Sequence, residues 1–460
     1  MQNNKRIIRV LIVVSAMFLA LVSYLLYFNM FQSEKVSSNP YNKRQWEDEK
    51  NTKRGSIYDC NGQLLAETVI DGDNHIRKYP YGHLYSHIIG YCSNVYGKSQ
   101  LEMTYDKELS GNGMFNISFG EMKIGNNLNL TIDNNLQSYA YDKLDGKRGA
   151  IVALEPSTGK ILTMVSFPDF DPSATALEKN WNNIVEREDA PLLARATGGM
   201  YAPGSTYKIV TTKAAYDEGY TDRVFEDDGV FKKDSLNVYN YGNEKYGKLT
   251  LKKAFELSSN DVFCSIGNEL GAGKVKSAAE SFGIDKNIES DISVSTSKIG
   301  YKKMSDLDAA LVSIGQGSLS MTPLHVAMMG AAVANNGKMM KPYLVDSITT
   351  EGGTVIGSTK PSIWASPMSA ECAAYITDLM IGVVKEGTGS NAAISGITVA
   401  GKTGTAENET KKDHAWFVGF APAENPKIAV AVILEYDGGA GGKNAAPIAR
   451  DIISKYLKGK

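Results

Sequence analysis

The sequence has 460 residues, 43% of them hydrophobic and 22% charged, which indicates about three globular domains and excludes a disordered chain or a multi-span membrane protein. The 49 Lys and Arg residues nearly balance the 51 Asp and Glu residues, so no basic excess indicates a nucleic-acid-binding protein. Four cysteines are too few for a disulfide scaffold. The five histidines include no H-E-x-x-H pattern, so the sequence gives little indication of a catalytic metal site.

An apolar segment over residues 7–28 opens the chain and contains one charge, Arg9. A helix of this length spans about 33 Å, enough for the core of a bilayer. Basic residues cluster at its start and no acidic residue precedes Glu34, so residues 1–6 are predicted to be cytoplasmic and the rest extracytoplasmic. A cleaved signal peptide is the alternative, but its apolar core would be shorter and a small-residue cleavage site would follow. The sequence therefore favours an uncleaved, single-pass anchor in the cytoplasmic membrane.

The next two stretches differ in composition. Residues 29–54 are polar and mixed in charge, which is typical of a juxtamembrane linker, whereas residues 55–129 contain short strand-like pieces with turns and predict a small β-rich module. Cys60 and Cys92 lie in this module and could form a disulfide, while two separate thiols fit the sequence equally well.

Strand patterns occur at both ends of residues 130–460, with a mainly helical centre over 200–345. Asp133 is expected to cap the first helix of this part, and helix 446–457 closes the chain. The predicted strands are 149–156 and 160–167, joined by a hairpin turn, and then 397–407, 414–422 and 427–436. This order predicts one α/β unit whose sheet unites the two ends of the domain.

Ser205 and Lys208 form an S-x-x-K pattern in an informative context. Two further S-x-x-K patterns begin at Ser157 and Ser295, in a hairpin turn and a Ser/Thr-rich run, whereas Ser205 opens a predicted helix directly after Pro-Gly. At the first turn of a helix, residues three apart lie on one face, close to free backbone N–H groups. A buried, neutral Lys can take the proton of a Ser hydroxyl, so this pair predicts a nucleophile and its base.

Two more motifs follow in order. Ser258 and Asn260 form an S-x-N pattern before a predicted helix, and Lys402, Thr403 and Gly404 form a K-T-G pattern in a predicted strand. Each motif alone fits a helix cap, a loop or a strand bulge. All three together, in this order, make coincidence improbable.

The three motifs resemble those of the penicillin-binding proteins. Similar segments extend over nearly the whole chain, at 54–67, 101–111, 130–137, 149–173, 313–327 and 414–422. Residues 29–129 leave too little room for the glycosyltransferase domain of class A, so the sequence resembles the compact class B transpeptidases. The resemblance implies an α/β (α+β) serine transpeptidase/β-lactamase-like domain over residues 130–460. A central antiparallel sheet with helices is expected there, and residues 55–129 are expected to form a pedestal.

The resemblance also implies a peptidoglycan D,D-transpeptidase that cross-links stem peptides and is acylated by β-lactams. Ser205 would attack the D-Ala-D-Ala carbonyl, Lys208 would take its proton and Ser258 would relay a proton to the leaving amine. Asn260 would hold the substrate amide and help to place Lys208. The substrate carboxylate would bind the Lys402-Thr403-Gly404 strand and Thr405, and the N–H groups of Ser205 and Thr405 would form an oxyanion hole. No cofactor or metal is implied, and a RodA/FtsW-type glycosyltransferase is the expected partner.

Two alternatives remain at this point: a D,D-carboxypeptidase or β-lactamase in which water replaces the amine, and a non-catalytic scaffold of a cell-wall complex. Arg195 is flanked by two alanines where relatives often have Asn-Arg-Ala, and it is expected to be a scaffold residue. His414 is also expected to be structural. His83 and His87 are four residues apart, and packing is favoured over metal binding for both.

Overall fold

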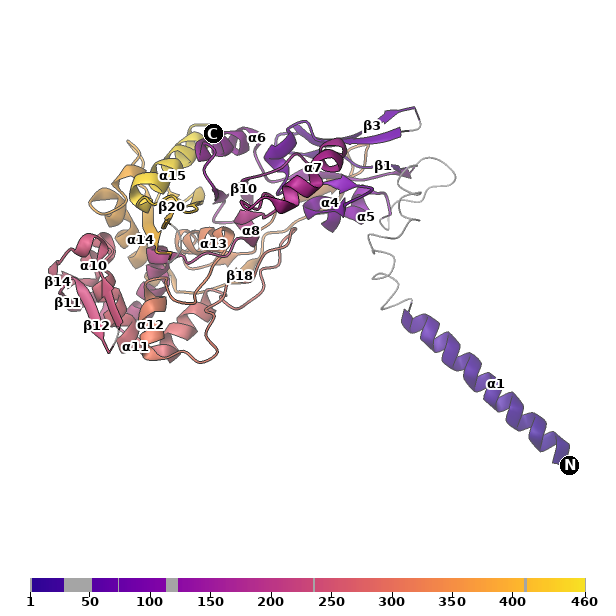
Figure 1. The fold of residues 1–460 in the computed structure, drawn as a ribbon, viewed down its shortest axis with the longest axis horizontal. Coiled ribbons are helices and arrows are strands. Elements are labelled where there is room, and N and C mark those ends of the chain that lie inside the picture. The colour runs from indigo at the N-terminus through magenta and orange to yellow at the C-terminus, as the bar shows by residue number, and fades with distance from the viewer. Residues whose placement is uncertain are drawn as a thin grey trace.

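The computed structural model describes residues 2–28, 52–72, 74–112, 123–234, 236–408 and 412–459. Helix α1 (Gln2–Tyr27) contains the apolar stretch Ile7–Tyr27, which is long and apolar enough to cross a membrane and is not buried against protein (Figure 1). The helix predicted over 7–28 is therefore present. Residues 29–51 of the predicted linker lie outside the described residues.

A five-stranded antiparallel sheet forms the centre of the larger part of the chain. Its order is β10-β9-β21-β20-β19, so strands from the two ends of this part are hydrogen-bonded neighbours. The strands are β9 (Gly149–Leu154), β10 (Ile161–Phe167), β19 (Ala400–Ala406), β20 (His414–Ala421) and β21 (Ile428–Leu434). The predicted hairpin of 149–167 and the three predicted C-terminal strands are confirmed.

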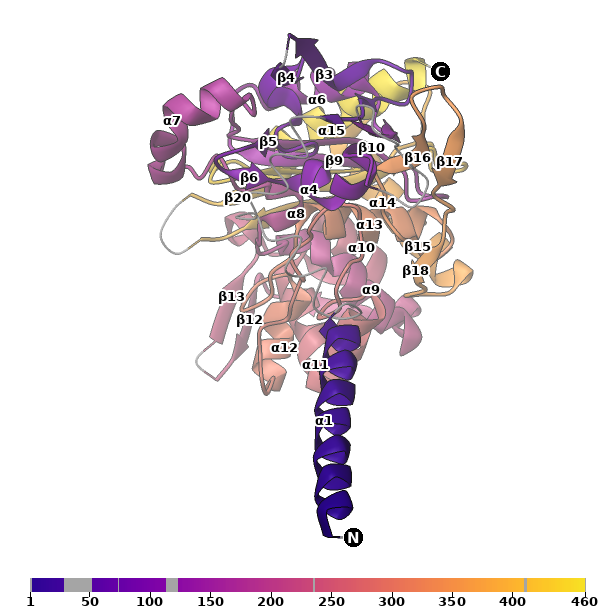
Figure 2. The ribbon, with the colours of Figure 1, turned by 90° about the vertical axis from the view of Figure 1, so that its right-hand side faces the viewer.

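Both faces of this sheet are buried, because side chains of a strand alternate between its two sides. In β9, Ile151 and Ala153 belong to a core shared with α6 (Asn134–Leu144) and α15 (Gly441–Lys458). Val152 and Leu154 belong to the core on the opposite face, which includes α13 (Pro323–Ala334) and α14 (Ala370–Lys385). Figure 2 shows α6 and α15 above the sheet and further helices below it. As predicted, Asp133 caps α6 by accepting from the N–H groups of Asn135 and Leu136.

A helical region lies beyond the sheet, at the lower left of Figure 1. Its helices are α9 (Lys208–Asp217), α10 (Leu251–Leu257), α11 (Asn260–Ser281) and α12 (Asp306–Ser313). Two small antiparallel ribbons accompany them, β11 (Val224–Asp227) with β14 (Gly247–Thr250) and β12 (Val230–Lys233) with β13 (Leu236–Tyr239).

The N-terminal module shares its sheet with a later part of the chain. The six-stranded order is β17-β16-β8-β2-β3-β4, in which β16 (Val345–Thr349) and β17 (Val355–Ser358) follow the helical region in sequence. The N-terminal strands are β2 (Ile57–Tyr58), β3 (Leu64–Asp71), β4 (Asn74–Lys78) and β8 (Asn127–Leu130). The module is thus joined to the larger part by strand pairing as well as by the chain.

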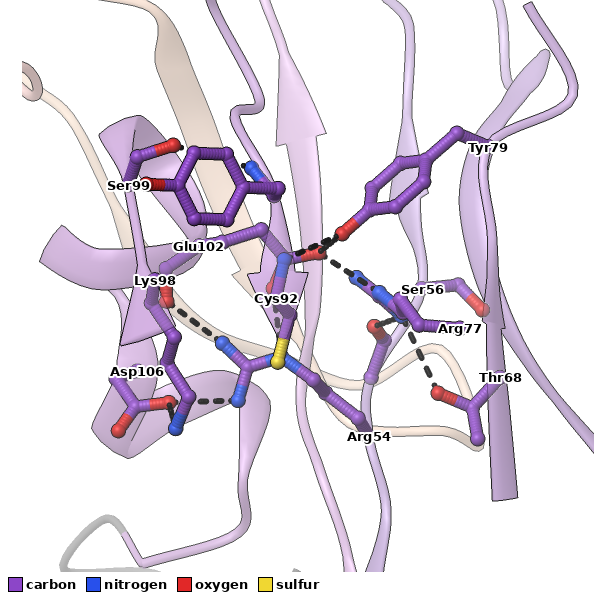
Figure 3. Close-up of polar contacts among 12 residues, drawn as sticks. Arg54, Ser56, Thr68, Arg77, Tyr79, Cys92, Lys98, Ser99, Glu102 and Asp106 are labelled. Carbon is purple, nitrogen blue, oxygen red and sulfur yellow. Dashed lines mark hydrogen bonds and ion pairs between the residues drawn. The ribbon is translucent and has the colours of Figure 1, made fainter. Parts of the chain in front are cut away.

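A buried ion network stabilises this module around Glu102, which lies in α4 (Gln100–Thr104) (Figure 3). Arg54 Nε and Arg77 Nε donate to the two oxygens of its carboxylate at 2.6 and 2.7 Å. Arg54 also pairs with Asp106, which Lys98 contacts at 2.7 Å. Burial alone would raise the pKa of Glu102, but Arg77 and Arg54 lower it to about 2.

The structure also places the two cysteines and two histidines that the sequence analysis considered in this module. Cys60 and Cys92 are not joined by a disulfide. His87 is buried, with Nε2 3.1 Å from the carbonyl oxygen of Pro168, and the ring of His83 lies against that of Tyr141.

Candidate active site

Ser205 lies in a tight turn next to the edge strand of the central sheet. The turn Gly204–Tyr207 is a 3₁₀ helix that runs directly into α9, so the helix predicted to open at Ser205 begins with a 3₁₀ turn. Gly204 has φ +54°, and a Cβ atom there would lie 2.5 Å from the carbonyl oxygen of Thr405 in β19. Only a glycine therefore lets the backbone beside Ser205 approach the K-T-G strand this closely.

Lys208 is buried beside the second motif, because it opens α9 and points at the start of α11. Its Nζ donates to the carbonyl oxygen of Ser258 at 2.7 Å and to Asn260 Oδ1 at 2.8 Å. It lies 5.3 Å from the centre of the Phe263 ring. Burial lowers the pKa of Lys208 to about 7. This amine can therefore be neutral near pH 7 and accept a proton.

Lys402, in strand β19, contacts the hydroxyl of Ser258 in the second motif. Its Nζ donates to Ser258 Oγ at 2.9 Å and to the carbonyl oxygen of Thr403 at 3.0 Å. Lys208 Nζ lies 3.3 Å from the same hydroxyl. Burial, and then the nearby charge of Lys208, hold the pKa of Lys402 well below its usual value. The two amines are therefore disfavoured from being protonated at the same time, and the hydroxyl of Ser258 between them can pass a proton from one to the other.

The structure brings all three motifs to one place. Gly404 of β19 also packs closely against the serine turn. A Cβ atom there would lie 3.0 Å from the carbonyl oxygen of Pro203 and from the methyl group of Thr206. The predicted site residues lie on three parts of the fold: Ser205 and Lys208 at the turn before α9 and its first residue, Ser258 and Asn260 at the junction of α10 with α11, and Lys402, Thr403, Gly404 and Thr405 in strand β19.

Two side chains that hold this site were not predicted. Thr388 Oγ1 lies 2.6 Å from Thr403 Oγ1, and Asn240 Oδ1 accepts from the backbone N–H of Asn260 at 2.7 Å. Both residues lie in loops of ordinary composition, so no sequence pattern marks them.

Arg195 and His414 support the fold around the site. Arg195 is fully buried and donates to Glu435 at 2.8 Å and to the carbonyl oxygen of Ala190 at 3.1 Å. His414 Nδ1 accepts from the backbone N–H of Tyr436 at 3.1 Å. These contacts fit the structural roles expected for both residues.

Comparison with known proteins identifies two domains. Residues 149–454 match the penicillin-binding protein transpeptidase domain, and residues 54–123 match the penicillin-binding protein A dimerisation domain. The chain is 34% identical to the peptidoglycan D,D-transpeptidase PbpA of Mycolicibacterium smegmatis, with 99% of each chain covered. It is 33% identical to PbpA of Mycobacterium tuberculosis, with 99% of this chain and 100% of the relative covered.

Solved structures agree. The penicillin G acyl-enzyme of penicillin-binding protein A from M. tuberculosis superposes with a TM-score of 0.83 at 34% identity, covering 88% of this chain and 100% of that one. The D,D-transpeptidase domain from Eggerthella lenta gives 0.81 at 36% identity, with 89% and 99% covered. Matched over nearly its whole length, the chain belongs to the class B penicillin-binding proteins and is a serine-type peptidoglycan D,D-transpeptidase that binds β-lactams.

Proposed function

We propose that Ser205 is the acylated residue of this transpeptidase and that Lys208 is its base. The observation that supports this most directly is the buried amine of Lys208. This amine donates to the carbonyl oxygen of Ser258 and to Asn260 Oδ1, and burial lowers its pKa to about 7. A neutral amine takes the proton of Ser205 Oγ while this oxygen attacks the carbonyl carbon of the penultimate D-Ala. The peptide bond to the terminal D-Ala breaks as the acyl-enzyme ester forms.

The proton then travels to the leaving amine through Ser258. Its Oγ lies within 3.3 Å of both Lys208 Nζ and Lys402 Nζ, so it can donate to the departing nitrogen and be reprotonated by a lysine. Asn260 places Lys208 through Oδ1 and presents the rest of its amide to the substrate. D-Ala leaves as a neutral amine with a free carboxylate.

Strand β19 would bind the substrate along its edge. Lys402, Thr403 and Thr405 orient the terminal carboxylate, and Gly404 keeps the strand close to the serine turn. The backbone N–H groups of Ser205 and Thr405 form the oxyanion hole, for which the close approach of Gly204 to Thr405 provides support. Each such donor is worth about 10²–10³ in rate.

In the second half-reaction, an amine of another stem peptide attacks the ester. Lys208 takes a proton from this amine, the ester bond breaks, and the proton returns to Ser205 Oγ as the cross-link forms. Attack by water instead would make the protein a carboxypeptidase or a β-lactamase.

The domain arrangement is also part of the proposal. Helix α1 anchors the chain in the bacterial cytoplasmic membrane with residues 1–6 inside, and residues 29–54 link it to a pedestal over 55–129 and a catalytic domain over 130–460. Basic residues at the start of the apolar segment support this orientation. The partner is a RodA/FtsW-type glycosyltransferase, which would supply the glycan strands.

Intact-mass measurement of the full chain in detergent, after incubation with penicillin G, tests the assignment. A stable increase by one drug molecule is expected in wild type and is expected to be lost in Ser205→Ala. The Ser295→Ala variant, which changes the serine of another S-x-x-K pattern, serves as a control and should still be labelled. Labelling of Ser205→Ala would refute the nucleophile, and rapid hydrolysis of the drug by wild type would favour a β-lactamase.

A further inference from the structure

A buried carboxylate that forms no ion pair among the described residues lies behind the second motif. Asp227 ends β11, is fully buried, and takes part in none of the ion pairs among the described residues. Its contacts are hydrogen-bond donors instead. Oδ1 accepts from the backbone N–H of Gly229 and from Asn240 Nδ2, both at 2.9 Å, and Oδ2 accepts from Ser259 Oγ at 2.5 Å and from Asn240 Nδ2 at 3.0 Å. A buried charge is expensive unless such donors surround it.

The same two side chains satisfy the first backbone N–H groups of α11. Asn240 Oδ1 accepts from the N–H groups of Asn260 and Asp261 at 2.7 and 3.1 Å, and Ser259 Oγ accepts from that of Val262 at 3.0 Å. A carboxylate can only accept hydrogen bonds. It therefore forces the amide nitrogen of Asn240 and the hydroxyl hydrogen of Ser259 toward itself, which leaves their oxygen lone pairs for the start of the helix.

The segment held in this way contacts the amine of Lys208 directly. Asn260, whose backbone is held by Asn240, accepts from Lys208 Nζ through its side chain and donates to the carbonyl oxygen of Tyr239 at 2.9 Å. The carbonyl of Ser258, next to the Asp227-bound Ser259, accepts from the same amine at 2.7 Å. A change at Asp227 would thus alter the two oxygen acceptors that lie closest to Lys208 Nζ, the carbonyl oxygen of Ser258 and Asn260 Oδ1.

We propose that Asp227 is a positioning residue for acylation: through Ser259 and Asn240 it fixes the Ser258–Asn260 segment so that Lys208 is held for proton transfer. The proposal rests on the role of Lys208 given under Proposed function. Asp227 is assigned no catalytic role, because its hydrogen bonds come from Gly229, Asn240, Tyr246 and Ser259 and reach Lys208 only through the second motif.

The charges around Lys208 give the proposal a distinctive readout. Lys402 faces the amine from β19, the thiol of Cys264 faces it from α11, and Asp227 lies behind the second motif. Burial lowers the pKa of Lys208, whereas the charge of Asp227 raises it. Burial raises the pKa of the Cys264 thiol to about 12, so this thiol carries no charge between pH 5 and 9. Removing the charge of Asp227 therefore lowers the pH at which Lys208 becomes neutral, an effect that loosened packing alone would not produce.

The test measures acylation of the full-length protein in detergent by a fluorescent penicillin between pH 5 and 9. Asp227→Asn is expected to slow acylation at pH 8 by about 10-fold or more and to move the acid limb down by about 0.5–1 pH unit. Ser259→Ala keeps the charge of Asp227. It should therefore slow the acylation step without shifting the acid limb of the pH–rate profile and without changing the affinity of the non-covalent complex. Asp228→Asn changes the neighbouring exposed carboxylate, which pairs with Lys245, and should match wild type.

Several outcomes would overturn the proposal. If the acid limb of the pH–rate profile of a folded Asp227→Asn protein matches that of wild type, the charge effect is excluded. If Ser259→Ala is acylated at the wild-type rate, the positioning role is excluded even if Asp227→Asn does not fold. A wild-type protein without any acid limb would remove Lys208 as the base, which is a failure of the proposed function that the limb comparison distinguishes from a failure at Asp227.

Discussion

Ser258 Oγ accepts a hydrogen bond from Lys402 Nζ at 2.9 Å, although the two residues are 144 positions apart in the chain. The same hydroxyl lies 3.3 Å from Lys208 Nζ, so one oxygen joins two buried amines. Two ammonium groups repel each other in this setting, and each disfavours the charged form of the other. The site is therefore built to release a proton near neutral pH, and its activity should report that titration.

Acylation should depend on pH through Lys208. Because burial lowers the pKa of Lys208 to about 7, the neutral base predominates above pH 7 and is lost below it. The second-order rate constant for acylation by penicillin G should be half-maximal near pH 7 and should fall about tenfold for each further unit of acidification. A rate constant that stays flat down to pH 5 would contradict a lysine base.

Replacing Lys208 by Met should abolish acylation and stabilise the fold. The pKa of Lys208 is about 7 in the folded protein, below the usual 10.5, so the unfolded chain binds more protons between these values. Stability therefore rises with pH across this window, and the penalty for charging the buried amine is fully present below pH 7. Lys208→Met removes this penalty, and after the loss of three hydrogen bonds we expect about 1–3 kcal/mol of stabilisation at pH 6.

Thermal unfolding at pH 6 and pH 10 checks this expectation, because the gain should shrink at the higher pH. Lys276→Met, on the exposed side of α11, is the matched control and should stay within about 0.5 kcal/mol of wild type. Equal effects of the two variants would show that the charge of Lys208 carries no penalty.

Gly204→Ala should destroy the active-site turn. The added Cβ would meet the carbonyl oxygen of Thr405 at 2.5 Å, at a residue with φ +54°, so the serine turn and β19 must separate. Gly219 also has a positive φ, +74°, but a Cβ there meets nothing within 4 Å. Gly219→Ala should therefore lose only about 1 kcal/mol and keep its acylation rate, whereas Gly204→Ala should lose acylation by more than about 100-fold. Similar acylation rates in the two variants would mean that this close approach is not required.

Local patterns predicted the central sheet and its flanking helices, because β9, β10 and β19–β21 are short runs whose side chains are buried on both faces. The ribbons β11–β14 and β12–β13 lie inside the centre predicted to be mainly helical. Their strands have only four residues each, which is too short for a periodic pattern to stand out in the sequence. The pairing of β16 with β8 joins Ile348 to Leu128, and contacts so distant in sequence leave no local signal.

The site divides in the same way. The residues that we propose to react stand in three compact sequence motifs, because the chemistry dictates their residue types. Asp227, Asn240 and Thr388 act by holding those motifs, and any residue of suitable shape and polarity in a nearby loop can serve. Only the tertiary arrangement identifies them.

Glu102→Gln should destabilise the N-terminal module without removing the transpeptidase chemistry. The change leaves Arg54 and Arg77 buried around a neutral amide, in which an NH2 donor replaces one carboxylate oxygen and faces a guanidinium. Breaking a buried pair in this way costs about 3–5 kcal/mol. Glu351 pairs with Lys53 on the surface, and Glu351→Gln should change stability by less than about 1 kcal/mol.

Thermal unfolding of the full chain, followed together with penicillin labelling, separates the effects of these two variants. The pKa of Glu102 is about 2, below its usual 4.5, so the network contributes fully above pH 4.5 and weakens as pH falls toward 2. The difference between wild type and Glu102→Gln should accordingly narrow in acid. Labelling at low temperature should persist, because the network lies in the module and not at Ser205. If Glu102→Gln unfolds like Glu351→Gln at pH 7, the two arginines do not depend on this carboxylate for their place in the fold.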